Sequence, residues 1–173
     1  MNPQGPVKGH NTQDGGQATD AKVNNPGVRF PPPLVYLAAV LIGAAFDRFI
    51  PVHLFPAGLT GWLGGSLVLI ALTISVLSFR EFIKARTSIR PDRSASALVT
   101  TGPFRYSRNP MYLALTMLQL GVGIWMNSVW VVVLLMPVIA CIRWCVIEPE
   151  ERYLIGRFGQ LYLDYQAKVR RWL

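Results

Sequence analysis

Long apolar stretches separated by short polar ones dominate the chain after residue 33. Leu59–Phe79 is 21 residues long and Met111–Ile142 is 32 residues long, and neither contains a charged side chain. An uncharged apolar run of about 18 residues or more is typical of a membrane-spanning helix rather than of a helix buried in a soluble protein. The pattern therefore predicts an all-α integral membrane helical bundle and excludes a soluble globular enzyme.

We predict about four transmembrane helices in this bundle. The long uncharged run exceeds one crossing, and Asn127-Ser128 near its middle indicates a turn. The predicted spans are about residues 34–50, 59–79, 111–126 and 129–147. At the helical rise per residue the third span reaches only about 24 Å, which leaves open whether it crosses the bilayer fully. Gly61 and Gly65 in the second span have the GxxxG spacing of close helix packing in lipid.

The polar segments complete the organisation of the chain. Residues 1–33 are rich in Gly, Asn, Gln and Pro without apolar periodicity, which predicts a disordered tail. Residues 34–173 then form one membrane domain, with a polar loop over 80–110. Near the C-terminus, apolar residues recur at steps of three, four and seven, which predicts an amphipathic helix over 149–172. This helix would lie along the membrane surface or fold back over the loop.

The distribution of basic residues predicts the orientation in the membrane. Residues 1–33 contain three Lys or Arg, 80–110 contain seven and 143–173 contain six, whereas the turns at 51–58 and 127–128 contain none. Basic segments mark the cytoplasmic side, so both termini and the loop are predicted to be cytoplasmic, at the cytoplasmic membrane in a bacterium. The net charge of +8 is thereby explained by topology, and nucleic acid is not a predicted partner.

Residues with metal or nucleotide chemistry are sparse. His10 and His53 are isolated, and Cys141 and Cys145 are one helical turn apart rather than in a CxxC motif, so we predict no metal site. No GxGxxG follows a candidate strand, which excludes a soluble dinucleotide-binding domain.

One polar stretch beside the membrane, Leu98–Tyr112, is rich in turn and capping signals. Pro110 can begin the third span, and Asn109 then stands where a helix N-cap belongs. In one interpretation Asn109 caps the helix while Arg105 and Arg108 anchor it at the interface. In the other, a helix start with two arginines binds an anionic group. The residues alone favour neither.

A second polar stretch, Glu148–Leu154, carries adjacent carboxylates. Pro149 can start a helix, and Glu150 and Glu151 would then lie in its first turn, where acids interact favourably with the helix dipole. Two carboxylates at a membrane surface can equally bind a cationic group such as an ammonium or a sulfonium.

Together these segments resemble a known family. Leu98–Tyr112, the uncharged hairpin, Glu150-Glu151 and the FGQLYLDYQAKV segment at Phe158–Val169 occur in the order found in the isoprenylcysteine carboxyl methyltransferase family. The related phospholipid methyltransferases share the Asn-Pro-Met-Tyr segment, here Asn109–Tyr112, and the paired glutamates. The resemblance implies a small integral membrane enzyme that transfers a methyl group from S-adenosylmethionine to a membrane-embedded acceptor.

The resemblance also implies a cofactor site. Glu150 or Glu151 would bind the amino group of S-adenosylmethionine, and Arg108 or the backbone around Gly102 would bind its carboxylate. The cofactor-binding residues implied are Gly102, Arg108, Asn109, Pro110, Tyr112, Glu150 and Glu151. The chain departs from the prenylcysteine enzymes, because Asn109, Ala114 and Thr101 stand where they have His, Gly and a second His.

The acceptor is predicted from its charge. A carboxylate acceptor, such as that of a prenylated cysteine, benefits from an arginine, and Arg143 and Arg105 are the catalytic candidates. A phospholipid amine must first lose a proton and so needs a base. Because the site region has no His, the carboxylate is favoured and the phospholipid amine is the alternative. A non-catalytic binding protein and a reductase relative on the same scaffold stay open, as does the oligomeric state.

Overall fold

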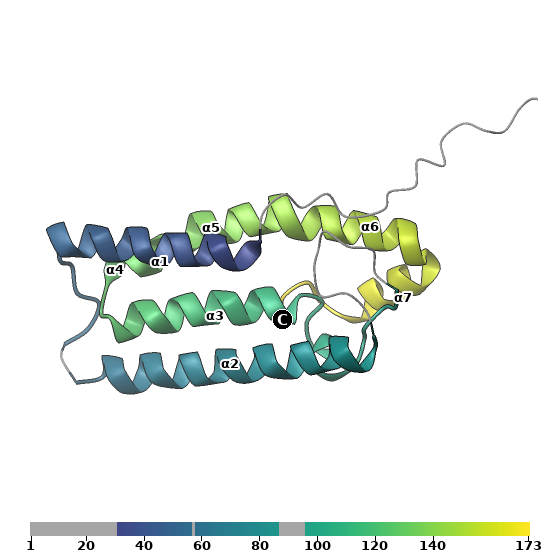
Figure 1. The fold of residues 1–173 in the computed structure, drawn as a ribbon, viewed down its shortest axis with the longest axis horizontal. Coiled ribbons are helices and arrows are strands. Elements are labelled where there is room, and N and C mark those ends of the chain that lie inside the picture. The colour runs from purple at the N-terminus through teal and green to yellow at the C-terminus, as the bar shows by residue number, and fades with distance from the viewer. Residues whose placement is uncertain (1–30, 57, 87–95) are drawn as a thin grey trace, which may run out of the picture.

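The computed structural model describes residues 31–56, 58–86 and 96–173, and every regular element in these ranges is helical (Figure 1). The all-α prediction is confirmed. Most of the tail predicted over residues 1–33 and the middle of the loop predicted over 80–110 lie outside the described residues.

The bundle consists of a few long helices that lie side by side, with shorter elements at one end (Figure 1). In order, the elements are α1 (Pro32–Phe49), α2 (Thr60–Lys84), the 3-10 turn η1 (Gly102–Arg105), α3 (Pro110–Trp125), α4 (Val129–Val133), α5 (Leu135–Ile142), the π-helical segment η2 (Arg143–Ile147), α6 (Glu148–Phe158) and α7 (Gln160–Lys168).

Within the described ranges, three helical runs are long and apolar enough to cross a membrane: Pro32–Phe49, Thr60–Lys84 and Val129–Phe158. The third predicted span appears as α3, an apolar helix of 16 residues. Large apolar side chains such as Phe49 and Trp62, each 83% exposed, lie on the outer surface of the helices. Such a surface is stable only in a hydrocarbon environment, so the protein is an integral membrane protein.

The helices pack against one another at several interfaces. A cluster that includes Tyr36, Ile142 and Val146 buries apolar side chains between α1 and the α5–η2 run. Helices α2 and α3 pack at Gly64, where a Cβ atom would lie 2.5 Å from the Trp125 nitrogen. Gly61 and Gly65 face open space instead, so the close approach does not use the GxxxG pair.

The predicted boundary between the fourth span and the C-terminal helix is absent. Residues 129–158 form one helical run, and Ile147 has helical angles of φ −64° and ψ −47°. The π-helical bond from the Glu148 N–H to the Arg143 carbonyl widens the turn before Pro149, which lets a proline stand inside the run. No free helix N-terminus therefore precedes Glu150 and Glu151, and the helix-dipole interpretation of these acids is wrong.

The polar end of the fold also differs from the predicted boundaries. Instead of one helix over 149–172, α6 and α7 meet at Gly159, whose φ of +55° favours glycine, and the chain is non-helical from Val169. Helix α2 continues to Lys84, beyond the predicted end at residue 79. The prediction ended at the last residue of the uncharged run, whereas the helix includes one further turn that contains charged side chains. Figure 1 shows α6, α7 and the C-terminus gathered at the end of the bundle where α3 begins.

Candidate functional site

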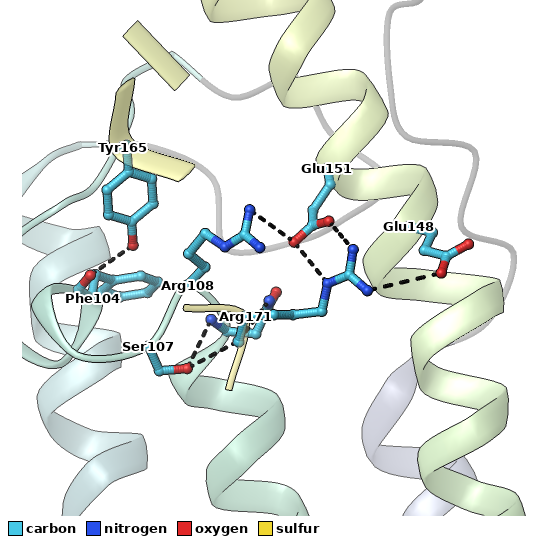
Figure 2. Close-up of polar contacts among 8 residues, drawn as sticks. Phe104, Ser107, Arg108, Glu148, Glu151, Tyr165 and Arg171 are labelled. Atoms are coloured by element: carbon cyan, nitrogen blue, oxygen red, sulfur yellow. Dashed lines mark hydrogen bonds and ion pairs between the residues drawn. The ribbon is translucent and has the colours of Figure 1, made fainter. Parts of the chain in front are cut away.

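The two polar stretches singled out in the sequence meet at this end of the bundle. Arg108, in the loop before α3, forms an ion pair with Glu151 of α6, with 3.4 Å between Nη1 and Oε1. Their side chains are only 10% and 7% exposed. Figure 2 shows the two side chains directed toward each other from different elements.

Glu151 has a second, stronger partner in Arg171. The Arg171 Nη2 donates to Oε2 at 2.6 Å, and its Nε donates to Oε1 at 3.2 Å. This two-pronged geometry is the strong form of an arginine–carboxylate contact. The hydrogen bonds to Glu151 raise the pKa of the Arg171 guanidinium above its ordinary value. Arg171 also approaches Glu148, with 3.9 Å between Nη1 and Oε1.

The backbone of the C-terminal segment is bound to the loop that carries Arg108. The Arg108 N–H donates to the Arg170 carbonyl at 2.9 Å. The Ser107 hydroxyl and the Asn109 side-chain amide both donate to the Arg171 carbonyl at 3.2 Å. Asn109 does occupy the N-cap position of α3, but its side chain makes no capping hydrogen bond. The expected capping role of the Asn109 amide is therefore wrong, because that amide binds the C-terminal segment instead.

Glu150 lies beside this cluster with a different environment. The Tyr112 hydroxyl donates to Glu150 Oε1 at 2.8 Å. Within the part of the chain that the structure describes, no Lys or Arg forms an ion pair with Glu150. Farther along α3, the Tyr36 hydroxyl shares a hydrogen bond with the Thr116 hydroxyl at 2.9 Å.

Two buried donor atoms of Arg108 form no hydrogen bond with the described residues. Nε has none, and Nη1 is held only by the ion pair with Glu151 at 3.4 Å. Buried polar groups in native proteins are nearly always hydrogen-bonded, so these two atoms make Arg108 a candidate for binding an acceptor from outside the chain.

A family model described as phospholipid methyltransferase matches residues 59–161, more than half of the chain. The chain belongs to the phospholipid methyltransferase family. The matched range includes Arg108, Tyr112 and both glutamates. An uncharacterised protein of Haemophilus influenzae is 38% identical over 65 residues, which cover 36% of this chain and 100% of that protein. Membership in the family indicates a methyltransferase that acts on a membrane-associated substrate.

Two tyrosines of α7, Tyr162 and Tyr165, are buried at the candidate site. The Tyr165 hydroxyl donates to the Phe104 carbonyl at 2.7 Å (Figure 2). Burial raises the pKa of Tyr165 to about 12, and burial also raises the pKa of Tyr162. Both phenols therefore stay neutral at physiological pH, and Tyr165 fixes the η1 turn to α7.

Gly102 and Pro110 shape the backbone near this site. Gly102 has φ +60°, and a Cβ there would lie 2.8 Å from the Glu81 Cγ of α2. The neighbouring Thr101 hydroxyl donates to the Glu81 carboxylate. Pro110 is buried in the first turn of α3. The backbone around Gly102 is therefore held by α2 rather than by the ion pair between Arg108 and Glu151.

The two predicted catalytic arginines differ in their contacts with the acidic residues of α6. Arg143 is about half exposed, and its Nε lies 3.5 Å from Glu148 Oε1, which Arg171 also approaches. Arg105 is exposed at the end of η1 and forms no ion pair with the residues that the structure describes. Among those residues no group of three or more His, Cys, Asp or Glu is arranged to hold a metal ion.

Sequence reasoning missed Arg171, Tyr162 and Tyr165. All three belong to the segment predicted as an amphipathic helix that lies along the membrane surface or folds back over the loop, and none of them was given a role at the site. The available signal was the basic pair Arg170-Arg171 near the end of that segment, which reaches the site because α6 ends at Gly159 and α7 ends before Val169.

Proposed function

We propose that the protein transfers a methyl group from S-adenosylmethionine to a lipid-like acceptor taken from the bilayer. The donor would bind at the polar end of the bundle, between Arg108 and Glu150. Its sulfonium supplies an activated methyl group, so the protein needs mainly to bind, orient and exclude water. The observation that carries the proposal is the presence at one end of the bundle of two buried Arg108 donor atoms without a hydrogen bond and of a carboxylate, Glu150, that forms no ion pair with a described Lys or Arg.

The Arg108 side is suited to the carboxylate of the donor. Arg108, Arg143 and Arg171 carry three positive charges against the two negative charges of their partners Glu148 and Glu151, which leaves an excess of about +1 on this side of the site. A carboxylate ligand would neutralise this excess and accept from the Nε and Nη1 atoms of Arg108, which form no hydrogen bond. Asn109 and Pro110 would form the wall at the start of α3.

The Glu150 side is suited to the ammonium group of the donor. Glu151 is already bound by two arginines, whereas Glu150 accepts one hydrogen bond, from Tyr112. A partly buried carboxylate without a cation is unfavourable, and a cationic ligand removes part of that cost. Of the two glutamates, we therefore assign Glu150 to the amino group.

The acceptor proposal rests on Arg143. This arginine is half exposed beside Glu148, at the level where the long helix leaves the apolar part of the bundle. A carboxylate acceptor, such as that of a prenylated cysteine, would be held by Arg143, with Arg105 as a second basic contact. A carboxylate is already nucleophilic at neutral pH and needs no base.

A phospholipid amine is the second candidate acceptor, and the matched family description favours it. An ammonium acceptor must lose a proton before it can attack. In that case Glu150, hydrogen-bonded to Tyr112, would act as the base that takes the proton instead of binding the amino group of the donor.

The site would face the cytoplasm. The loop over 80–110 and the segment from 143 onward carry most of the basic residues of the chain, and such segments remain on the cytoplasmic side. The methyl donor is a polar metabolite, so a cytoplasmic opening for it and a lateral, lipid-facing entry for the acceptor are compatible.

The test is a methyl-transfer assay on the full chain in vesicles. S-adenosylmethionine with a labelled methyl group is supplied to vesicles that contain either phosphatidylethanolamine or a prenylated cysteine, with Arg108→Met as the inactive control. The proposal predicts label in one extracted lipid and none with the control. Donor binding without any transfer, in these vesicles and in native membranes, would instead support a non-catalytic binding protein.

A further inference from the structure

The strongest contact at the polar end of the bundle belongs to a residue outside the matched range 59–161, Arg171. Given the proposed function, we propose that Arg171 is a positioning residue of the methyl-donor site. By holding both oxygens of Glu151, it keeps the Arg108 donors available for the carboxylate of the methyl donor.

The geometry of the three charged side chains carries this inference. Arg171 binds Glu151 through two short hydrogen bonds, 2.6 Å and 3.2 Å long, whereas Arg108 has one contact of 3.4 Å. A carboxylate has about four acceptor positions and takes the best-aligned guanidinium first. Because Arg171 takes this role, Arg108 retains two buried donor atoms, Nε and Nη1, that form no hydrogen bond with the described residues.

Removal of the Arg171 charge would change which group Arg108 binds. Glu151 is only 7% exposed, so a single long ion pair would leave its charge poorly compensated. Arg108 would then rotate into the two-pronged arrangement with Glu151 that Arg171 has now. Its donors would be consumed internally, and the donor carboxylate would lose its partner.

The backbone of the C-terminal segment keeps Arg171 in this position. The Arg170 and Arg171 carbonyls accept hydrogen bonds from Ser107, Arg108 and Asn109. Trp172 packs against the apolar cluster between α1 and α5. Arg171 is therefore attached to the same loop as Arg108, so its distance from Glu151 is set by the loop as well as by α6 (Figure 2).

The test measures binding of S-adenosylmethionine to the full chain in detergent by calorimetry, together with the KM for the donor and kcat. Arg171→Met should raise Kd and KM by about tenfold or more while kcat changes by less than about threefold. Arg171→Lys should give an intermediate Kd, because lysine cannot donate two parallel hydrogen bonds. Arg157→Met, an exposed arginine of α6, removes the same charge and should leave Kd within about twofold.

A double substitution separates positioning from a merely structural role. In Glu151→Gln with Arg171→Met the buried negative charge is gone, so Arg108 is no longer drawn to residue 151. Donor affinity should then recover by about threefold or more relative to Arg171→Met alone. The double variant also keeps the test valid if Arg171→Met alone fails to fold. In that case the Kd of the double variant for the donor should stay within about tenfold of the Kd of the unsubstituted protein.

Two results would overturn the inference while sparing the proposed function. One is an unchanged Kd in folded Arg171→Met. The other is a double variant that binds the donor no better than Arg171→Met or, where Arg171→Met does not fold, a double variant whose Kd is more than about tenfold above that of the unsubstituted protein. Failure of the unsubstituted protein and of Arg157→Met to bind the donor at all would instead refute the proposed function itself.

Discussion

The two ends of the bundle use polar groups in opposite ways. At the turn end, the Asn127 side chain accepts from the Leu54 and Phe55 N–H groups at 2.9 Å and 3.0 Å and donates to the Phe55 carbonyl at 2.9 Å. The Trp130 indole donates to the Ile50 carbonyl at 2.7 Å. These contacts are neutral and matched, and they join the two loops of the bundle.

At the other end the polar groups are charged, largely buried and incompletely matched. Arg108 has two donor atoms that form no hydrogen bond with the described residues, and Glu150 accepts one hydrogen bond and forms no ion pair with a described Lys or Arg. Matched contacts fix a fold, whereas buried unmatched ones are tolerated where a ligand completes them. The comparison therefore separates a structural end from the end where we propose the methyl-donor site. Asp47, near the turn end, has a buried Oδ1 without a hydrogen bond, and it stands alone rather than in a cluster.

The sharpest way to break the comparison is to substitute both sides of the proposed donor site. Arg108→Met and Glu150→Gln should each lower kcat/KM for methyl transfer by about 100-fold or more, because each removes the charged partner of one donor group. The measurement is the labelled-methyl assay at limiting donor. Asn127→Ala is the matched control from the turn end and should change kcat/KM, per folded molecule, by less than about threefold.

Arg143 gives the next largest expected effect. Arg143→Ala should lower kcat by about tenfold or more while the Kd for S-adenosylmethionine stays unchanged, because Arg143 is proposed to contact the acceptor rather than the donor. Steady-state kinetics with calorimetry on the same preparation checks both values. Unchanged turnover would remove Arg143 from the acceptor site and favour the phospholipid amine.

Asn127→Ala tests the turn end directly. The substitution removes three hydrogen bonds, and Asn127 has φ +55°, a conformation that alanine tolerates less well. We expect a loss of about 2 kcal/mol in the free energy of unfolding, measured in mild detergent. Equal stability would mean that the two loops are held by the apolar contacts alone.

Tyr165→Phe should have a smaller effect at the site end. It deletes the hydrogen bond to the Phe104 carbonyl, worth about 1 kcal/mol of stability. Because burial raises the pKa of Tyr165 from 10.0 to about 12, this residue's stabilisation is complete below pH 10 and declines as the pH rises toward 12. The stability difference between the two proteins should therefore shrink over that range, and a constant difference would exclude this titration.

The smallest expected effect concerns Asp47. Asp47→Asn should leave kcat/KM within about twofold, since the residue is at the end of the bundle away from Arg108. A large loss of methyl transfer would show that the turn end participates in the reaction and would contradict the comparison.

The parts of this structure that follow from local pattern were predictable from the sequence. Uncharged apolar runs predict where the helices lie, because backbone N–H and C=O groups in lipid must form hydrogen bonds within the chain. The approach of Arg108 to the glutamates also follows, since both polar stretches flank apolar spans and must emerge at the bilayer surface.

The parts that depend on tertiary partners were not predictable. The pattern favours Gly61 and Gly65 as a packing pair, but the rotation of α2 brings Gly64 against α3. Asn109 has a capping position, but the Arg171 carbonyl competes for its amide. Pro149 has a helix-start signal that the π-helical turn before it overrides. In each case a contact from another segment decides between local alternatives.

The most direct test of the central claim is calorimetric binding of S-adenosylmethionine to the purified full chain and to Arg108→Met, Glu150→Gln and Asn127→Ala. We predict that the unsubstituted protein and Asn127→Ala bind with similar Kd, whereas each of the other two binds about tenfold more weakly or worse. Equal affinity in all four proteins, or no binding in the unsubstituted one, would contradict a donor site between Arg108 and Glu150.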